Sequence, residues 1–118
     1  MPNLYTKELI DHYKNPHRFH KMEDADLTGN AVNSLCGDEL TLYVKNEDGI
    51  VVDSSFEGTG CAICIGTMSL FIDTFIGKSI RDLFKISDEE VLTRISMEAD
   101  SSRKRCATLT IEAVQKLK

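Results

Sequence analysis

The chain has 118 residues, of which 42% are hydrophobic and 28% charged, and its formal net charge is −5. These values predict one globular domain, residues 1–118, which buries roughly two thirds of its unfolded surface and needs no metal merely to fold. No long basic run is present, so the chain lacks the concentrated positive surface that nucleic-acid binding requires, and nucleic acid is not an expected partner.

The N-terminal segment is polar and carries charges at Lys7, Glu8 and Asp11, so it does not have the apolar core of a signal peptide. The most apolar stretch, residues 61–76, contains Asp73 and is too short to span a bilayer. We therefore expect a cytoplasmic protein without a membrane partner. In the cytosol thiols stay reduced, and separated cysteines are more often metal ligands or catalysts than disulfides.

The first third of the chain predicts one helix followed by irregular structure. Asn3 is a candidate N-cap, and Asn15-Pro16 ends the helix because the residue before proline is forced out of the helical region. Residues 17–27 are polar and indicate a loop, and residues 29–35 form a weak strand pattern. Three histidines gather near the end of this helix and are expected to face solvent: His12, His17 and His20.

From Asp38 onward the pattern is typical of a β-hairpin. Leu40, Leu42 and Val44 alternate with polar residues, which places them on one face of a strand. Residues 46–49 supply a turn, and residues 50–57 return as a second, antiparallel strand.

The C-terminal half predicts helices. Residues 61–76 carry apolar side chains at helical spacing and end at Gly77, and residues 87–90 have the form of a capping box that opens a short helix. The last helix is expected to begin near Asp100 or Ser101. Its buried face is predicted to contain Cys106, Leu109, Ala113, Val114 and Leu117. The expected fold is α+β: a small antiparallel three-stranded sheet, an N-terminal helix, and a helical C-terminal half packed on one face.

Three of the four cysteines stand in settings that suit a metal. Cys36 and Asp38 are two residues apart, so an extended backbone points both side chains to one side, and Cys61 follows the return strand. The start of one hairpin strand neighbours the end of the next, so these three residues should meet. Cys106 joins them only if the last helix packs with its N-terminal part against the same end. A helix N-terminus stabilises a thiolate, which favours Cys61 and Cys106 as anionic ligands.

Simpler interpretations exist for each residue. A free cysteine usually only packs in a core, and an aspartate such as Asp38 often caps a turn. Cys61-x-x-Cys64 has the spacing of a redox dithiol but is not preceded by the parallel strand of a thioredoxin-like unit. The residues alone therefore indicate a metal-binding or thiol-chemistry protein without a named reaction.

Five motifs, in this order and spacing, resemble the U-type iron–sulfur cluster assembly scaffolds, the family of IscU, SufU and the N-terminal part of NifU. They are residues 10–16, Cys36-Gly37-Asp38, residues 56–61, Gly77-Lys78 and residues 106–109. The resemblance implies a metal or cofactor site formed by Cys36, Asp38, Cys61 and Cys106, with Cys106 as the sulfur acceptor.

For function, the resemblance implies a scaffold that accepts sulfur from a cysteine desulfurase, assembles a labile [2Fe-2S] cluster on the three cysteines and the aspartate, and transfers it to apo iron–sulfur proteins. The alternative is a SufU-type, zinc-dependent sulfurtransferase, which would be an enzyme rather than a scaffold. A structural-zinc interaction domain is a third hypothesis. The cofactor is accordingly a transient [2Fe-2S] cluster or Zn²⁺, and a homodimer is left open.

Features of both types occur together. Arg103 and residues 106–109 resemble SufU, whereas the short distance from Gly77-Lys78 to Cys106 resembles IscU. Arg105 replaces a histidine usual in IscU, and residues 98–102 replace the Leu-Pro-Pro-Val-Lys segment that a dedicated chaperone recognises, so transfer of that kind is not expected. Cys64 replaces a residue that is usually small and polar. We expect it to pack in the core, with a second sulfur-relay thiol as the alternative.

Overall fold

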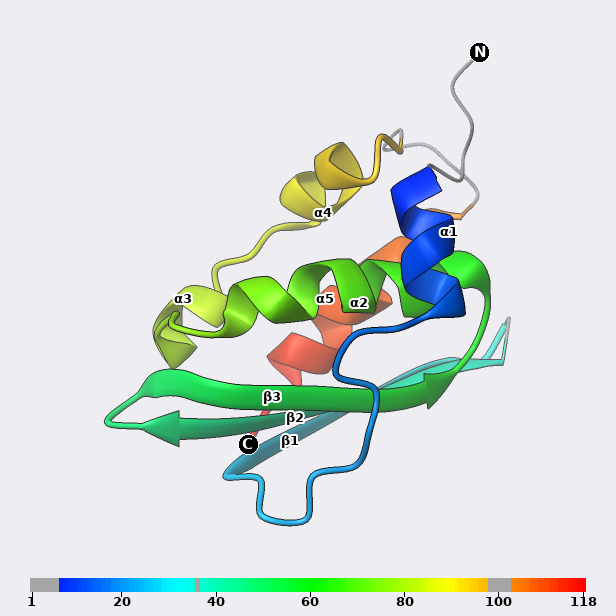
Figure 1. The fold of residues 1–118 in the computed structure, drawn as a ribbon. Helices are drawn as coiled ribbons and strands as arrows, with labels where there is room; N and C mark the ends of the chain where they lie inside the picture. The colour runs from blue at the N-terminus through cyan, green and yellow to red at the C-terminus, as the bar shows by residue number, and fades with distance from the viewer. Residues whose placement is uncertain (1–6, 36, 98–102) are drawn as a thin grey trace.

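The computed structural model describes residues 7–35, 37–97 and 103–118, and it has the predicted α+β architecture. The elements in chain order are α1 (Lys7–Lys14), β1 (Leu27–Asn33), β2 (Asp38–Glu47), β3 (Ile50–Thr59), α2 (Ala62–Phe75), α3 (Ile80–Leu83), α4 (Asp88–Arg94) and α5 (Lys104–Gln115). The three strands form one antiparallel sheet in the order β1-β2-β3. The helices lie on one face of this sheet (Figure 1). The predicted fold class is confirmed.

The hairpin β2–β3 forms as predicted and is slightly longer. Leu42 lies opposite Phe56, and Glu39 lies opposite Thr59, two residues beyond the expected end of the strand. Asp48 and Gly49 adopt positive φ angles of 53° and 82°, as a tight hairpin turn requires. The predicted inward face is buried: Leu40, Leu42 and Val44 are all 0% exposed.

Strand β1 begins at Leu27, two residues before the predicted start, and it fixes the position of α5. A Cβ on Gly29 would lie 2.1 Å from the carbonyl oxygen of Ala113, so only glycine allows α5 this close to the sheet. Thr28 and Lys118 also exchange backbone hydrogen bonds of 3.2 and 3.3 Å. The C-terminal end of α5 is thus held at the start of β1, and its N-terminal end lies towards the other end of the sheet.

Helix α2 is the centre of the fold, with buried residues on almost every side. It packs on α1, α5 and β3. Helix α1 approaches so closely that a Cβ on Gly66 would lie 2.7 Å from the carbonyl oxygen of Leu9. Gly77, with φ of 89°, follows the end of α2 as predicted.

Two helical features differ from the prediction. The short helix α3 was not predicted, although Ser79 caps it by accepting a 3.0 Å hydrogen bond from the backbone N–H of Asp82. Helix α5 begins at Lys104, and the predicted starts, Asp100 and Ser101, lie outside the described residues, as does Asn3. The predicted cap of α4 is confirmed, because the Ser87 hydroxyl accepts a hydrogen bond from the Glu90 amide.

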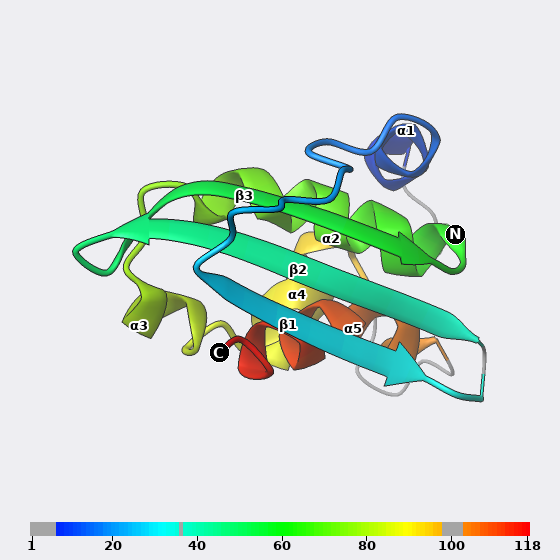
Figure 2. The same cartoon turned by 90° about the horizontal axis from the view of Figure 1, so that it is seen from below.

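The segment between α1 and β1 runs beside β3 and then crosses the sheet on the side away from the helices (Figure 2). Phe19 forms an isolated bridge with Phe56, and their rings meet edge to face with centroids 5.1 Å apart. In the described part of the chain no helix is long and apolar enough to cross a membrane. The cytoplasmic location and the single-domain extent of residues 1–118 stay predictions.

Candidate metal centre

The hairpin end holds Asp38 beside Cys61, as predicted. Asp38 opens β2 and is only 2% exposed, and Cys61 stands between β3 and α2. The backbone N–H of Cys61 donates a 3.2 Å hydrogen bond to Asp38 Oδ1. The Cys61 Sγ lies 4.0 Å from the other carboxylate oxygen, Oδ2. One oxygen is therefore held by the backbone while the other faces the sulfur.

Gly60 makes room for this carboxylate. A Cβ at position 60 would lie 2.8 Å from Asp38 Oδ1, closer than real side chains approach. The sequence shows a glycine before Cys61, but the reason for it depends on Asp38 folding back over the peptide of residue 60.

Helix α5 brings the third residue to the same place. Cys106 is the third residue of α5, is 2% exposed, and has its backbone N–H bonded to the carbonyl of Arg103 at 3.0 Å. One ligand atom each from Asp38, Cys61 and Cys106 lies within 4.8 Å of the others. The packing of α5 that the sequence could only assume is thus correct. Cys36 lies outside the described residues, and the roles of all four residues as metal ligands stay predictions.

The donor set fits a soft or borderline metal. Two sulfurs and one carboxylate oxygen suit Zn²⁺, whose thiolate ligands at 2.3 Å stand about 3.8 Å apart in a tetrahedron, and thiolates are the usual ligands of iron–sulfur clusters. Among the residues that the structure describes, no other group of three or more histidine, cysteine or acidic side chains comes this close together.

The electrostatics of Cys106 differ from the expectation drawn from its helix position. Burial, together with the negative charge of Cys61 and Asp38, raises the pKa of the Cys106 thiol to about 12. In the metal-free chain this effect outweighs the helix N-terminus, which was predicted to favour the thiolate. A cation held by this site would supply the opposing charge and favour deprotonation, so its binding would release protons.

Cys64 lies in the first turn of α2 and is fully buried, as the packing interpretation predicts. Burial raises the pKa of its thiol, and the charges of Asp38, Cys61 and Cys106 raise it further.

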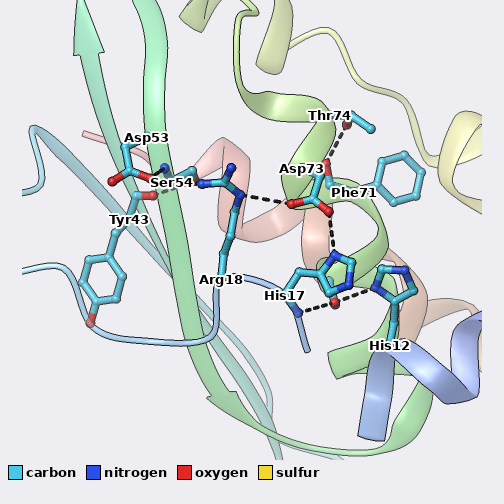
Figure 3. A network of polar contacts seen from close by, with 10 residues as sticks. His12, His17, Arg18, Tyr43, Asp53, Ser54, Phe71, Asp73 and Thr74 are labelled. Atoms are coloured by element: carbon cyan, nitrogen blue, oxygen red, sulfur yellow. Dashed lines mark hydrogen bonds and ion pairs between the residues drawn. The ribbon is translucent and has the colours of Figure 1, made fainter. Parts of the chain in front are cut away.

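A polar network ties α1 and the following loop to α2 (Figure 3). Ser69 Oγ lies 2.7 Å from His12 Nδ1 and accepts a 2.8 Å hydrogen bond from the backbone N–H of His17. The His17 ring contacts Asp73 Oδ2 at 2.6 Å, and Arg18 bonds the same carboxylate at 3.0 Å. The prediction that the three histidines face solvent holds for His17 and His20, which are exposed, whereas His12 is half-buried, and the network itself was not predicted. Ser69 and Asp73, four residues apart on one face of an apolar helix, were the available signal.

A protein-family model described as "NifU-like N terminal domain" matches residues 4–117 of the chain. The chain belongs to this family. Among curated proteins, "Iron-sulfur cluster assembly scaffold protein IscU 1" of Archaeoglobus fulgidus is 32% identical over 113 residues, covering 96% of this chain and 73% of that protein. "Zinc-dependent sulfurtransferase SufU" of Bacillus subtilis is 30% identical over 135 residues, covering 98% of this chain and 90% of that protein.

Solved structures share the fold of this NifU-like domain. A crystal structure titled as a putative iron-sulfur cluster assembly scaffold protein for the SUF system, from Fervidobacterium islandicum, superposes with a TM-score of 0.81 and 24% identity over 95% of this chain and 94% of that one. A nitrogen-fixing NifU-like protein (N-terminal) from Brucella abortus gives a TM-score of 0.65 at 23% identity, covering 95% of this chain and 78% of that chain. At these identities the likeness concerns the fold alone.

Proposed function

We propose that this NifU-like domain is a scaffold for iron–sulfur cluster assembly. The observation that carries the proposal is the convergence of Asp38, Cys61 and Cys106 at one buried end of the hairpin, within 4.8 Å of one another. Family membership and the similarity to IscU of Archaeoglobus fulgidus support it. The expected partners are a cysteine desulfurase as sulfur donor and apo iron–sulfur proteins as acceptors.

The mixture of ligands suits a cargo that has to leave. Thiolates hold iron well, whereas a carboxylate oxygen is a harder and poorer ligand for it. Asp38 is the oxygen ligand in this proposal, and the Cys61 amide keeps its Oδ1 hydrogen-bonded and its Oδ2 towards the sulfur. The domain thus binds a cluster firmly enough to assemble it and loosely enough to release it.

Sulfur is proposed to reach the site as sulfane sulfur on a cysteine. Cys106 is the predicted acceptor, but it is 2% exposed, whereas Cys61 is partly exposed. Their sulfurs lie within 4.8 Å, so a sulfane sulfur that arrives on one can pass to the other by thiol exchange. We therefore propose Cys61 as the outer member of this pair and Cys106 as the inner one.

A zinc-dependent sulfurtransferase is the second candidate function. It is favoured by the similarity to SufU of Bacillus subtilis, which extends over 98% of this chain, and by a donor set that Zn²⁺ accepts equally well. Metal analysis of the purified protein, followed by a desulfurase activity assay without iron, separates the two. A scaffold needs iron to form product, whereas the sulfurtransferase stimulates the desulfurase with zinc alone.

Anaerobic reconstitution with a desulfurase, cysteine and ferrous iron tests the scaffold proposal. We expect a visible cluster chromophore in the natural chain, none in Cys61→Ser, and a longer-lived cluster in Asp38→Ala because its most labile ligand is gone. Asp53→Ala is the control, since Asp53 lies on the exposed side of β3 and bonds Arg18. Faster cluster loss in Asp38→Ala would contradict the role given to the carboxylate. A chain that binds zinc but neither accepts sulfur nor stimulates the desulfurase is a structural-zinc domain instead.

A further inference from the structure

Helix α2 begins with two thiols, and the proposed function uses only one of them. Cys61 is the N-cap of α2, with extended backbone angles (φ −77°, ψ 171°), and its side chain makes no capping hydrogen bond. Cys64 is the third residue of the helix and is 0% exposed. The carbonyl of Cys61 accepts the first helical hydrogen bond, from Ile65 at 3.1 Å, so the turn that joins the two cysteines is fully formed.

Cys61 and Cys64 are the N-cap and the third residue of α2. This is the Cys-x-x-Cys spacing at a helix N-terminus, at which two cysteines can form a disulfide. The partly exposed Cys61 is open to a sulfur donor, whereas the buried Cys64 is shielded from external thiols and oxidants.

We propose that Cys64 resolves a persulfide carried by Cys61, releasing hydrosulfide beside Asp38 and Cys106. This inference rests on the proposed function for the delivery of sulfur. The Cys64 sulfur attacks the inner sulfur of Cys61–S–SH, a Cys61–Cys64 disulfide forms, and the outer sulfur leaves as hydrosulfide with the thiol proton. The two cysteine sulfurs are oxidised to the disulfide, and the sulfane sulfur takes up both electrons. A dithiol reductant then restores the two thiols for the next round.

The reaction gives Cys64 a role that the assembly chemistry requires. A desulfurase supplies sulfur at the sulfane level, whereas a cluster contains sulfide, so two electrons must be added at the site. A thiol fixed one helical turn away supplies them without a diffusing partner, and such intramolecular reactions are strongly favoured over bimolecular ones. Attack requires the Cys64 thiolate, and burial raises the pKa of this thiol; its proton therefore passes to the anionic outer sulfur of the persulfide during the attack, and that sulfur leaves as hydrosulfide.

The experiment compares the natural chain with Cys64→Ser, Cys64→Ala and a matched control, Thr67→Val. Thr67 lies one turn further along α2, is 0% exposed, and has a hydroxyl without a hydrogen-bond partner, so this change alters α2 but leaves every thiol in place. Metal-free protein is loaded anaerobically with glutathione persulfide and desalted. Released sulfide is then measured, and the intact mass and the disulfide-linked peptides are read by mass spectrometry.

We expect the natural chain and Thr67→Val to release one sulfide per bound sulfur and to lose two hydrogens, with the disulfide joining Cys61 to Cys64. Both Cys64 variants should retain the persulfide and release sulfide at least ten times more slowly. Equal release rates in all four proteins would overturn the inference, as would a disulfide from Cys61 to Cys106 or the absence of a lasting persulfide in both Cys64 variants. A parallel loading with the desulfurase judges the proposed function separately. If the desulfurase loads no cysteine, that function fails, while the chemical loading still decides the role of Cys64.

Discussion

Replacing Gly60 by alanine should weaken metal binding although residue 60 offers no ligand. The added Cβ would lie 2.8 Å from Asp38 Oδ1, the oxygen that accepts the hydrogen bond from the Cys61 amide. The buried carboxylate must therefore leave its position or strain the hairpin. We expect this displacement to turn the second oxygen, Oδ2, away from the Cys61 sulfur.

Two estimates set the size of the effect. Losing a hydrogen bond to a charged group, or overpacking a buried site, lowers the free energy of unfolding by about 1–3 kcal/mol. For a domain of this size that corresponds to a fall of roughly 4–12 °C in the melting temperature. Disturbing a group that orients a ligand typically reduces metal affinity by about 10–100-fold.

The assay is a competition titration of Zn²⁺ against a chromophoric chelator, carried out on Gly60→Ala, Asp38→Ala and the double variant. If alanine at position 60 acts through the carboxylate, the double variant binds no more weakly than Asp38→Ala, and the coupling energy is about 1.4–2.7 kcal/mol. Thr59→Ala, at the exposed neighbouring residue, is the control. Losses that simply add in the double variant would refute the placement of Asp38 against Gly60.

Three further predictions concern the attachment of α1. Ser69→Ala removes the hydrogen-bond partner of the His12 ring and of the His17 amide, so amide hydrogen exchange in α1 should accelerate by the equivalent of about 1–2 kcal/mol, and much less in β2. An equal acceleration in the sheet would contradict local docking of α1. Thr74→Ala, which removes a hydroxyl elsewhere on α2, is the control. Burial, and then the charge of His17, lowers the pKa of His12, so the unfolded chain binds a proton more readily than the folded chain does. The free energy of unfolding should therefore fall as pH drops below about 6.5. His12→Gln should reduce this dependence of stability on pH, as measured by thermal melts at several pH values. Arg94 forms a two-point ion pair with Glu8 at 2.7 and 3.0 Å, but both side chains are about half exposed. Glu8→Gln should therefore lower the free energy of unfolding by less than about 1 kcal/mol, and by less still in high salt. A larger loss would contradict the small contribution expected of an exposed ion pair.

The meeting of Asp38 and Cys61 could be predicted because it depends on local structure. The alternation of Leu40, Leu42 and Val44 fixes the faces of β2, and the turn at residues 46–49 fixes which end of β3 returns beside it. Nothing beyond the hairpin is needed for that result.

The position of Cys106 could not be predicted in this way. It depends on where α5 docks, and that is decided by the close approach at Gly29, more than 70 residues earlier in the chain. Only the family resemblance supplied it. The link between His17 and Asp73 is equally long-range, because helical spacing shows that Ser69 and Asp73 share a face but not which segment covers them.

The thiol of Cys106 shows a different limit. Its place at the start of a helix is visible in the sequence and suggests a stabilised thiolate. Its desolvation is not visible there, because burial comes from elements far away in the chain, and burial is the stronger influence on the pKa.

Close contacts at the C-terminal end of α5 give the helix a fixed point about which it can tilt. Its fulcrum is the contact between Gly29 and Ala113, clamped further by the bonds between Thr28 and Lys118, and Cys106 stands seven residues away, about 10 Å along the axis. A tilt of roughly 10° about that fulcrum carries the Cys106 sulfur by about 2 Å, comparable with the length of a metal–sulfur bond. Because Cys106 is 2% exposed and α5 also packs on α2 and β2, such a tilt requires these elements to repack, so the position of the sulfur depends on the contacts along the whole helix.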